Sequence, residues 1–192
     1  MEFILASSNA HKAQEFSLLF NDSSIDVLAA DEKLEVVEDG STFNENAYLK
    51  AQAYFKKFKR PIMSDDSGLV VEALTGELGI HSARFGGKRL LDRERAELLL
   101  QRMEGKSDRR AYFHCSLCFY LSDDEIYFFE GRLAGEISLE YLGDAGFGYD
   151  PVFIPEELKG EGLTLAQAPE WKEKNSHRAQ ACRFATNFWA KQ

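Results

Sequence analysis

The feature that most constrains the fold is a pair of long, apolar-rich segments joined by a short polar turn. Residues 111–121, AYFHCSLCFYL, place an apolar side chain at every second position from Ala111 to Leu121. This period of two is typical of a strand that turns one face toward a core. After the polar SDDE turn, residues 125–138, EIYFFEGRLAGEIS, form the expected partner strand. The sequence therefore predicts a central antiparallel pair.

Segments with helical and extended patterns surround this pair. Apolar residues recur every three or four positions in the predicted helices, which cover residues 13–20, 43–58, 96–103 and the segment from Ser176 onward, with Ala181, Phe184, Ala185 and Phe188 on its buried stripe. Thr42 and Glu45 form a capping box before the second helix. Short apolar segments predict strands at 2–7, 25–29 and 61–64, and residues 69–74 continue the third as an extended or helical stretch. Helices that alternate with strands in this way predict an α/β sheet protein.

Composition narrows the classes of protein that remain. With 44% hydrophobic residues among 192, the chain can bury a sizeable core. No apolar stretch approaches the roughly 20 residues of a membrane-spanning helix, and the start MEFILASSN lacks a basic leader, so we expect a cytoplasmic protein without a membrane partner. The formal net charge of -9 argues against nucleic-acid binding. Cys115, Cys118 and Cys182 form no regular framework, which favours reduced thiols, and the first two would face opposite sides of their strand.

Two adjacent carboxylates, Asp65 and Asp66, follow the strand predicted at 61–64 and precede a second apolar run. Neighbouring carboxylates repel each other unless a cation, a proton or water separates their charge. One interpretation is a Mg²⁺ site, in which Glu38 or Asp39 from a second acidic loop adds an oxygen ligand and substrate phosphates complete the octahedron. A remaining carboxylate could then orient or deprotonate water. The other interpretation is an exposed turn, because Asp, Ser and Gly favour turns.

A strand-to-helix junction precedes the first predicted helix, in residues 7–12, SSNAHK. A helix N-terminus offers free backbone N–H groups and a positive dipole end, so the hydroxyls of Ser7 and Ser8, together with Lys12, could hold phosphate oxygens. The alternative is an ordinary Ser/Asn cap beside a solvated lysine.

A late glycine-rich segment, residues 146–153, GFGYDPVF, carries groups suited to a planar heterocycle. Its glycines allow close backbone approach, Phe147 and Tyr149 offer flat apolar faces, and Asp150 accepts hydrogen bonds. The alternative is a tight loop whose aromatic side chains fill the core.

The last helix begins with an unfavourable charge. Ser176 is the expected N-cap in NSHRAQA, so His177 and Arg178 lie in the first helical turn. A cation at a helix start is unfavourable unless an anionic group compensates it. A ligand-binding role is therefore one interpretation of this motif, and a surface His–Arg pair is the other.

Taken together, these segments resemble the inosine triphosphate pyrophosphatases of the Ham1 type over nearly the whole chain. The motifs that carry the resemblance are the Ser-x-Asn-x-x-Lys turn at 7–12, ENA with KA at 45–51, DDSGL at 65–69, GIxSAR at 79–84, FGYDP at 147–151 and SHR at 176–178. Their common order and spacing make the match specific, whereas each motif alone would be weak. Ser8 departs from the family pattern, which usually has Gly there.

The resemblance implies a fold and a reaction. The fold would be a mixed central sheet flanked by helices, in an elongated, two-lobed single domain of residues 1–192 with the nucleotide cleft between the lobes. The reaction would be hydrolysis of ITP, dITP and XTP to the monophosphate and pyrophosphate with Mg²⁺ as cofactor, which removes these non-standard purine nucleotides from the pool. The family also implies a homodimer.

The same resemblance assigns roles to individual residues. Asp66 would be the general base or water-orienting carboxylate, and the metal ligands would be Glu38, Asp65 and Asp66. The groups that line the triphosphate and sugar would be Ser7, Ser8, Asn9, Ala10, His11, Lys12, Lys50, Ser67 and Arg84. The groups around the base would be Phe147, Gly148, Tyr149, Asp150, Lys172, His177 and Arg178. Asp39 is an alternative to Glu38, and Lys174 to Lys172, because the sequence around both positions departs from the family pattern.

Base selectivity would follow from hydrogen bonding. An oxygen at purine position 6 accepts a hydrogen bond from Arg178 or a backbone N–H, whereas the amino group of adenine would leave that donor unmet. Two other functions stay open. A Maf-like nucleotide pyrophosphatase would also begin with a Ser-containing turn, but it gives no reason for the FGYD and SHR motifs. A nucleotide sensor without turnover would have no need of Asp66.

Overall fold

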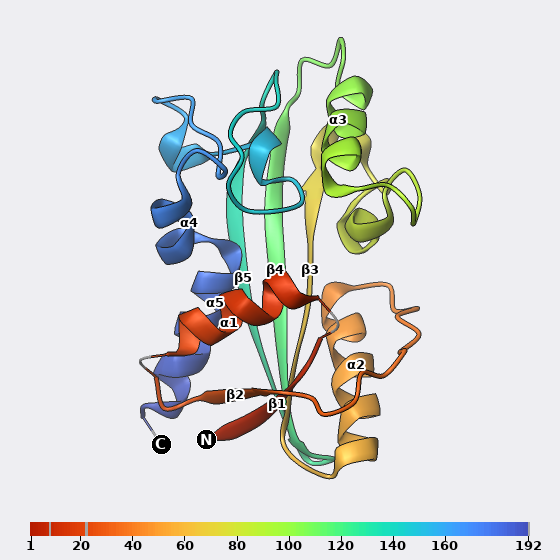
Figure 1. Cartoon of the computed structure of the whole chain (residues 1–192), viewed down its shortest axis with the longest axis vertical. Coiled ribbons are helices and arrows are strands. Elements are labelled where there is room, and N and C mark those ends of the chain that lie inside the picture. Colours follow the sequence, from red (N-terminus) through yellow and green to blue (C-terminus); the bar gives the residue numbers. More distant parts are fainter. Residues whose placement is uncertain (8, 22, 192) are drawn as a thin grey trace. The chain divides into compact units, whose positions relative to one another are not determined.

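The computed structural model describes residues 1–7, 9–21 and 23–191 (Figure 1). Within this part of the chain the strands form a six-stranded sheet in the order β2-β1-β3-β4-β5-β6. They are β1 (Glu2–Ala6), β2 (Asp26–Ala29), β3 (Ile62–Val71), β4 (Arg110–Ser122), β5 (Glu125–Ile137) and β6 (Phe153–Pro155). β1 is parallel to β2 and β3, whereas β6 is antiparallel to β5, so the predicted mixed sheet is confirmed.

The chain divides into two compact units, and each has a hydrophobic core of its own. The first unit contains Met1–Ser67, Cys115–Gly131 and His177–Gln192, and the second contains Gly68–His114 and Arg132–Ser176. Strands β3, β4 and β5 contribute residues to both units. The elongated shape, the single domain and the nucleotide cleft stay predictions.

The first unit has helices on both faces of its strands: α1 (Ala10–Phe20) and α5 (His177–Trp189) on one face, and α2 (Phe43–Phe58) on the other. Successive side chains of a strand point to opposite faces. Phe3 and Leu5 of β1 therefore pack on the α1 and α5 side, and Ile4 and Ala6 pack on the α2 side. Figure 1 shows α2 and α5 on opposite sides of these strands.

Helix α2 begins where the capping box predicted. Thr42 is the N-cap, and its Oγ1 accepts a hydrogen bond from the backbone N–H of Glu45 at 3.1 Å. The return bond differs from the usual capping box, because the Glu45 carboxylate accepts from the backbone N–H of Ser41, at 2.6 Å. The helix ends at Lys59, whose left-handed backbone, with φ of 55°, stops further helical hydrogen bonding.

The second unit contains α3 (Asp92–Arg102), α4 (Pro169–Asn175) and four 3₁₀ turns among its described residues, which are Glu72–Leu74, Gly79–Arg84, Asp150–Val152 and Glu156–Leu158. Its core includes Leu69, Leu99, Phe113 and Phe153. Arg95 of α3 is also buried, and its guanidinium donates to the carbonyl oxygens of Phe85, Gly87 and Leu90. The helix predicted at 96–103 is confirmed, although it begins earlier.

The predicted stripe of the last helix is wrong at Phe184, which is 56% exposed. The fully buried face of α5 instead contains Ala181, Cys182, Ala185 and Trp189. Because each residue turns a helix by about 100°, a face centred on Cys182 and Ala185 leaves Phe184 outside it.

The cysteine predictions are confirmed. Cys115, Cys118 and Cys182 are free and buried. Cys115 belongs to the core on the α1 and α5 side and Cys118 to the core on the α2 side, so the two thiols lie on opposite faces of β4. Among the described residues, none of the helices combines the length and apolar character that crossing a bilayer requires.

Candidate active site

The two adjacent aspartates lie within a strand rather than after one. β3 runs from Ile62 to Val71 without a break, so the predicted strand end at the Asp pair and the exposed turn are both wrong. Side chains that follow each other in a strand point to opposite faces. Asp65 accordingly contacts Lys12 of α1, while Asp66 contacts Asn46 of α2. This separation explains how two neighbouring carboxylates, 1% and 8% exposed, are tolerated.

Asp65 is held by donors from several elements. Its Oδ2 accepts from Lys12 Nζ at 2.7 Å and from Ser67 Oγ at 2.6 Å, and its backbone oxygen accepts from Lys50 Nζ at 3.0 Å. Its Oδ1 is buried and has no hydrogen-bond partner within the described residues. Because a buried, unpaired carboxylate oxygen is unfavourable, Oδ1 marks a position that a further donor or a cation would stabilise.

Asp66 contacts α2, the helix that also binds the acidic loop. Its Oδ2 accepts from Asn46 Nδ2 at 3.2 Å. Lys50, four residues further along α2, forms an ion pair with Glu38 Oε2 at 3.0 Å. Glu38 is partly buried, whereas Asp39 is exposed. The structure therefore favours Glu38 over Asp39 as the acidic-loop residue of this site.

The charges of this group shift its acid–base properties. Burial raises the pKa of Asp66 to about 6, reinforced by Asp65 and opposed by Lys50 and Lys12. Burial alone would also raise the pKa of Asp65, but Lys12, Lys50 and Arg178 outweigh it and hold that pKa well below its ordinary value. Burial would lower the pKa of Lys50, yet the neighbouring carboxylates hold it above its ordinary value. At neutral pH Asp65 is therefore a fixed anion, whereas Asp66 can accept a proton near physiological pH.

The start of α1 combines a helix cap with a lysine that forms an ion pair. Asn9 is the N-cap, and its Oδ1 accepts from the backbone N–H groups of His11 at 3.0 Å and Lys12 at 3.2 Å, as the cap interpretation expects. Ser7 Oγ accepts from the backbone N–H of Asn9 at 3.2 Å. Lys12 is not merely solvated, because it forms the ion pair with Asp65. The prediction for Ser8 lies outside the described residues, and Ala10 is described only as the first residue of the helix.

Arg178, in the first turn of α5, is compensated by an acidic side chain. Its side chain is 6% exposed, and its guanidinium forms an ion pair with Glu15 Oε2 of α1 at 2.6 Å. A second contact joins Arg178 Nη2 to Ser67 Oγ at 3.5 Å, and Ser67 in turn donates to Asp65. The neighbouring His177 is also buried. The interpretation as a surface His–Arg pair is therefore wrong.

A second group of predicted residues lies in the second unit, around Asp150. Its Oδ2 accepts from the backbone N–H of Phe147 at 2.9 Å and forms an ion pair with Lys172 Nζ at 2.8 Å. Lys172 Nζ also lies 4.7 Å from the centroid of the Phe147 ring, a cation–π distance. Gly146 has φ of 78°, and an added Cβ would lie 2.2 Å from Asp150 Oδ2, so the turn requires glycine. Lys172 is buried whereas Lys174 is exposed, which favours Lys172.

The remaining predicted residues of the second unit have varied settings. Tyr149 is buried and donates from its hydroxyl to the carbonyl oxygen of Ser82 at 2.8 Å, so it stabilises the Gly79–Arg84 turn. The backbone N–H of Gly148 donates to Asp92 at 3.0 Å. Arg84 is exposed and contacts the ring of His81.

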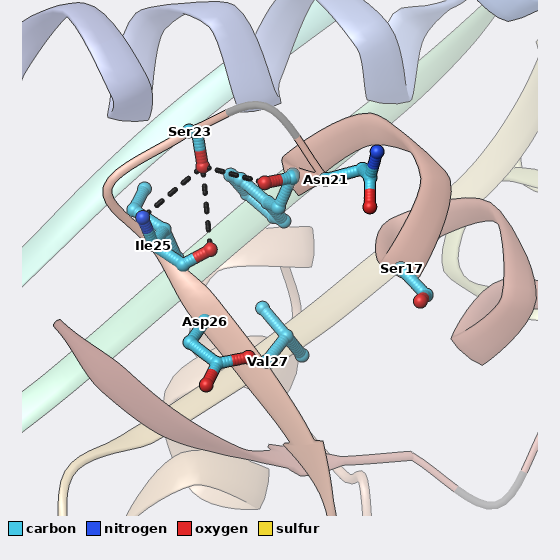
Figure 2. Close-up of a pocket in the computed structure, with 7 residues that line it drawn as sticks. Ser17, Asn21, Ser23, Ile25, Asp26 and Val27 are labelled. Atoms are coloured by element: carbon cyan, nitrogen blue, oxygen red, sulfur yellow. Dashed lines mark hydrogen bonds between the residues drawn. The ribbon is translucent and has the colours of Figure 1, made fainter.

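A pocket of about 220 Å³ lies elsewhere in the first unit, between the end of α1 and β2 (Figure 2). Ser17, Asn21, Asp26 and Val27 contribute to its lining. Ser23 beside them is satisfied locally, because its hydroxyl bonds the backbone of Phe20 and Ile25. No predicted site residue lines this pocket, so it is separate from the carboxylate–lysine group.

The structure thus brings the predicted residues together in two groups, each within one unit. The first-unit group contains Lys12, Glu38, Lys50, Asp65, Asp66, Ser67 and Arg178, and the second-unit group contains Phe147, Asp150 and Lys172. Sequence reasoning missed Glu15 and gave no role to Asn46. Glu15 lies three residues after Lys12, which places both on one face of α1, and that spacing could have indicated it.

The carboxylate oxygens of the first-unit group suit a hard divalent cation. Carboxylate oxygens are the ligands that Mg²⁺ prefers, and it usually takes one or two of them together with substrate phosphates and water. The described residues contain no group of three or more His, Cys, Asp or Glu side chains placed to hold a metal by themselves. The carboxylate of Asp66 is nevertheless buried, and an oxygen-binding cation beside it would stabilise its charge. The unpaired Oδ1 of Asp65 lies on the other face of β3. The residues fit the ion as a cofactor shared with a phosphorylated ligand.

The fold and the site define the class of the protein: it is a mixed α/β sheet protein with a group of paired carboxylates and lysines beside β3. The model of the Ham1 family matches residues 3–188. The chain therefore belongs to the Ham1 family.

Known relatives resemble the chain over nearly its full length. The dITP/XTP pyrophosphatase of Aquifex aeolicus is 42% identical over 193 residues, which cover 95% of this chain and 94% of that protein. The dITP/XTP pyrophosphatase of Geobacillus kaustophilus is 41% identical over 98% of this chain and 94% of that protein. Among solved structures, the Staphylococcus aureus Ham1 protein aligns with a TM-score of 0.87 at 38% identity, covering 100% of this chain and 99% of that chain.

Proposed function

We propose that the protein is a nucleoside-triphosphate pyrophosphatase that hydrolyses ITP, dITP and XTP to the monophosphate and pyrophosphate, and so removes these nucleotides from the pool. The observation that carries the proposal is the arrangement around β3, in which Asp65 and Asp66 face opposite sides of the strand beside Lys12 and Lys50. The dITP/XTP pyrophosphatases that share about 40% of its residues support the same reaction.

The first-unit group supplies the charge that a triphosphate needs. The protein has a formal net charge of -9, so a polyanionic substrate must meet local cations. Lys12, Lys50 and Arg178 gather around Asp65 and are the cations for the phosphates. Ser67 adds a hydroxyl donor, and the predicted contacts of Ser7, Ser8, Asn9, Ala10, His11 and Arg84 with the phosphates and sugar belong to the same proposal.

Asp66 is the residue best suited to act on water. Its carboxylate is kept in place by Asn46, and burial raises its pKa to about 6, close to the operating pH of a general base. A base with this pKa can accept a proton from water and still be largely ionised at neutral pH. Asp65, whose pKa is held low, instead keeps Lys12 and Ser67 oriented.

Glu38 and Asp66 are the residues that would hold Mg²⁺, with Asp65 as a predicted third ligand. When bound, Mg²⁺ would offset the charge that develops on the phosphate oxygens. The side chain of Asp65 lies on the opposite face of β3 from that of Asp66, and it already forms an ion pair with Lys12. Glu38 and Asp66 are therefore the principal ligands in this proposal.

In this proposal the second-unit group recognises the purine base of the substrate. Phe147, whose backbone N–H bonds Asp150, presents its aromatic ring beside Lys172, and Lys172 supplies a buried donor. Such donors satisfy an oxygen at purine position 6. The amino group of adenine would leave them unpaired, so ATP is a poor substrate. The predicted contacts of His177 and Arg178 with the base are a separate part of the proposal.

Two further properties belong to the proposal. The protein works as a homodimer, as the resemblance implies, and it works in the cytoplasm, where nucleotide pools are kept. Sedimentation of the purified chain at micromolar concentration tests the first property, with twice the mass of 21.8 kDa as the expected result. Sedimentation as a monomer across that concentration range would contradict it.

The experiment that tests the function is a panel of ITP, dITP, XTP, ATP and GTP with Mg²⁺, with pyrophosphate and orthophosphate measured separately. We expect pyrophosphate from ITP, dITP and XTP, and roughly 100-fold slower turnover of ATP because its amino group mismatches the site. Orthophosphate as the primary product, or equal rates for ITP and ATP, would contradict the proposal.

An Asp66→Asn variant separates hydrolysis from binding. The amide keeps the shape of the carboxylate but cannot accept a proton, so kcat should fall by roughly 100- to 10,000-fold while ITP binding, measured by calorimetry, persists. A wild-type protein that binds ITP without any turnover would instead favour the nucleotide sensor.

A further inference from the structure

Helix α2 holds the acidic loop, residues 31–41, along much of its length. The contacts between the loop and the helix are Glu32 with Lys57 at 2.9 Å, the N–H of Leu34 with Tyr54 Oη at 3.0 Å, Glu38 with Lys50 at 3.0 Å, the N–H of Gly40 with Asn46 Oδ1 at 2.9 Å and the N–H of Ser41 with Glu45 Oε2 at 2.6 Å. The loop and the helix thus run in opposite directions along the chain. α2 therefore fixes where Glu38 lies.

Asn46 is the contact in this series that also reaches Asp66. Its side chain is buried, at 1% exposure, and it uses both ends of its amide. Oδ1 accepts from the backbone N–H of Gly40, and Nδ2 donates to Asp66 Oδ2 at 3.2 Å. Because the Gly40 N–H can only donate, it fixes the amide orientation and directs the NH₂ group toward the carboxylate.

Gly40 allows this arrangement. An added Cβ at position 40 would lie 2.7 Å from Glu45 Cβ and 2.8 Å from Asn46 Oδ1, closer than real Cβ contacts. The acidic loop therefore reaches Asn46 only because position 40 lacks a side chain. Loop, helix and strand meet at the Asn46 amide.

We propose that Asn46 is a positioning residue that couples the acidic loop carrying Glu38 to the carboxylate of Asp66. This inference rests on the proposed function, since it concerns how the carboxylates of Glu38 and Asp66 in that site are held in position relative to each other. Asn46 touches neither substrate nor metal in this role. It acts through Gly40 on one side and Asp66 on the other.

Two substitutions separate the two halves of this role. Asn46→Ala removes both hydrogen bonds, so the amide of Gly40 should exchange with solvent faster and kcat for ITP should fall by roughly 10- to 100-fold, the range expected for a lost hydrogen bond to a charged group. Asn46→Asp keeps an acceptor for Gly40 but replaces the donor to Asp66 with a second carboxylate. Its Gly40 amide should therefore stay protected while kcat falls at least as far. In both variants KM should change less than threefold.

Asn44→Ala and Asn44→Asp are the matched controls, because Asn44 lies one position before Glu45 on the same helix and bonds Ser116 instead. These variants should keep kcat within about twofold of the wild type, so the effect would belong to the Asp66 contact and not to α2 in general. Equal kcat for the Asn46 and Asn44 variants, at unchanged Gly40 exchange, would overturn the inference.

A measurement on the wild-type protein does not depend on how well the variants fold. With asparagine labelled by ¹⁵N, the side-chain NH₂ signals of Asn46 should shift when Mg²⁺ is added without nucleotide, whereas those of Asn44 should not. Unchanged Asn46 signals at saturating Mg²⁺ would overturn the coupling even if ITP is hydrolysed. If instead the wild type fails to hydrolyse ITP, it is the proposed function that is lost.

Discussion

At the scale of single residues, the site is defined by two neighbouring aspartates with opposite electrostatic settings. Asp65 is surrounded by Lys12, Lys50 and Arg178 and is held ionised, whereas Asp66 has few donors beyond Asn46 and a pKa of about 6. Their pKa values are pushed apart because β3 sends the side chains to opposite faces. One carboxylate is therefore structural and the other is available for proton transfer.

This difference predicts a pH-dependent stability for the metal-free protein. The folded pKa of Asp66, about 6, exceeds its ordinary value of 3.8, so the folded state favours the protonated form. Its contribution to stability is full below pH 3.8 and is lost as pH rises through 6. Asp65 behaves oppositely, because its lowered pKa makes a contribution that is present above pH 3.8 and lost on further acidification. Between pH 4 and 7 the Asp66 contribution therefore falls as pH rises, whereas most of the Asp65 contribution is already present.

Asp66→Asn should consequently stabilise the metal-free protein at pH 8, by roughly 1–3 kcal/mol for a shift of about two pKa units. The amide removes the buried charge but keeps an acceptor for Asn46. The gain should be much smaller at pH 4.5, where folded wild-type Asp66 is largely protonated, and it should vanish only below pH 3.8, where the unfolded Asp66 is protonated too. Urea unfolding in EDTA at pH 8 and pH 4.5 measures it, and a difference that does not vary with pH would contradict the assigned pKa.

At the scale of elements, the periodic patterns predicted the longer helices and strands. Predictions from short local sequences were wrong where packing between distant segments determines the structure. The Asp-Asp-Ser-Gly sequence favours a turn by its residue types, yet β3, which lies between β1 and β4 in the sheet, continues through it to Val71. β6 and α4 were not predicted, because both are short and lie in a segment rich in glycine and proline, which favour loops. Phe184 fits a helical spacing but misses the buried face, because hydrophobic pattern alone does not say where that face is centred.

The contact between β5 and α5 depends on a glycine. An added Cβ at Gly131 would lie 2.0 Å from the carbonyl oxygen of His177 and 2.9 Å from the backbone nitrogen of Ala181. Gly131→Ala must therefore push the start of α5 outward, at a cost of roughly 1–3 kcal/mol of unfolding free energy. Because α5 begins with His177 and Arg178, KM for ITP should also rise.

Thermal unfolding and steady-state kinetics check this prediction, with Gly160→Ala as the matched control. An added Cβ at Gly160 would meet no atom within 4 Å, so that variant should match the wild type. Equal stability of the two variants would contradict the close approach of α5 to β5.

At the scale of the whole molecule, the ordered motifs located the site residues, but not how they are grouped. The family resemblance could indicate that Lys12, Lys50 and Asp65 serve one ligand, since it names all three. It could not show that Asp65 and Asp66 face different helices, or that Lys172 is buried against Asp150, because both follow from the registers of strands and helices far apart in the chain. The proposed polyanionic ligand needs local cations on a protein with a net charge of -9, and Lys12, Lys50 and Arg178 around Asp65 are such a group.

The most direct test of the central claim is a crystal structure of the wild-type protein with Mg²⁺ and an α,β-methylene analogue of ITP, which resists hydrolysis. The account predicts the ion between the phosphates and the carboxylates of Glu38 and Asp66, with Lys12 and Lys50 on phosphate oxygens and the methylene bridge facing Asp66. A nucleotide bound away from Asp66, or an ion that touches neither carboxylate, would contradict it.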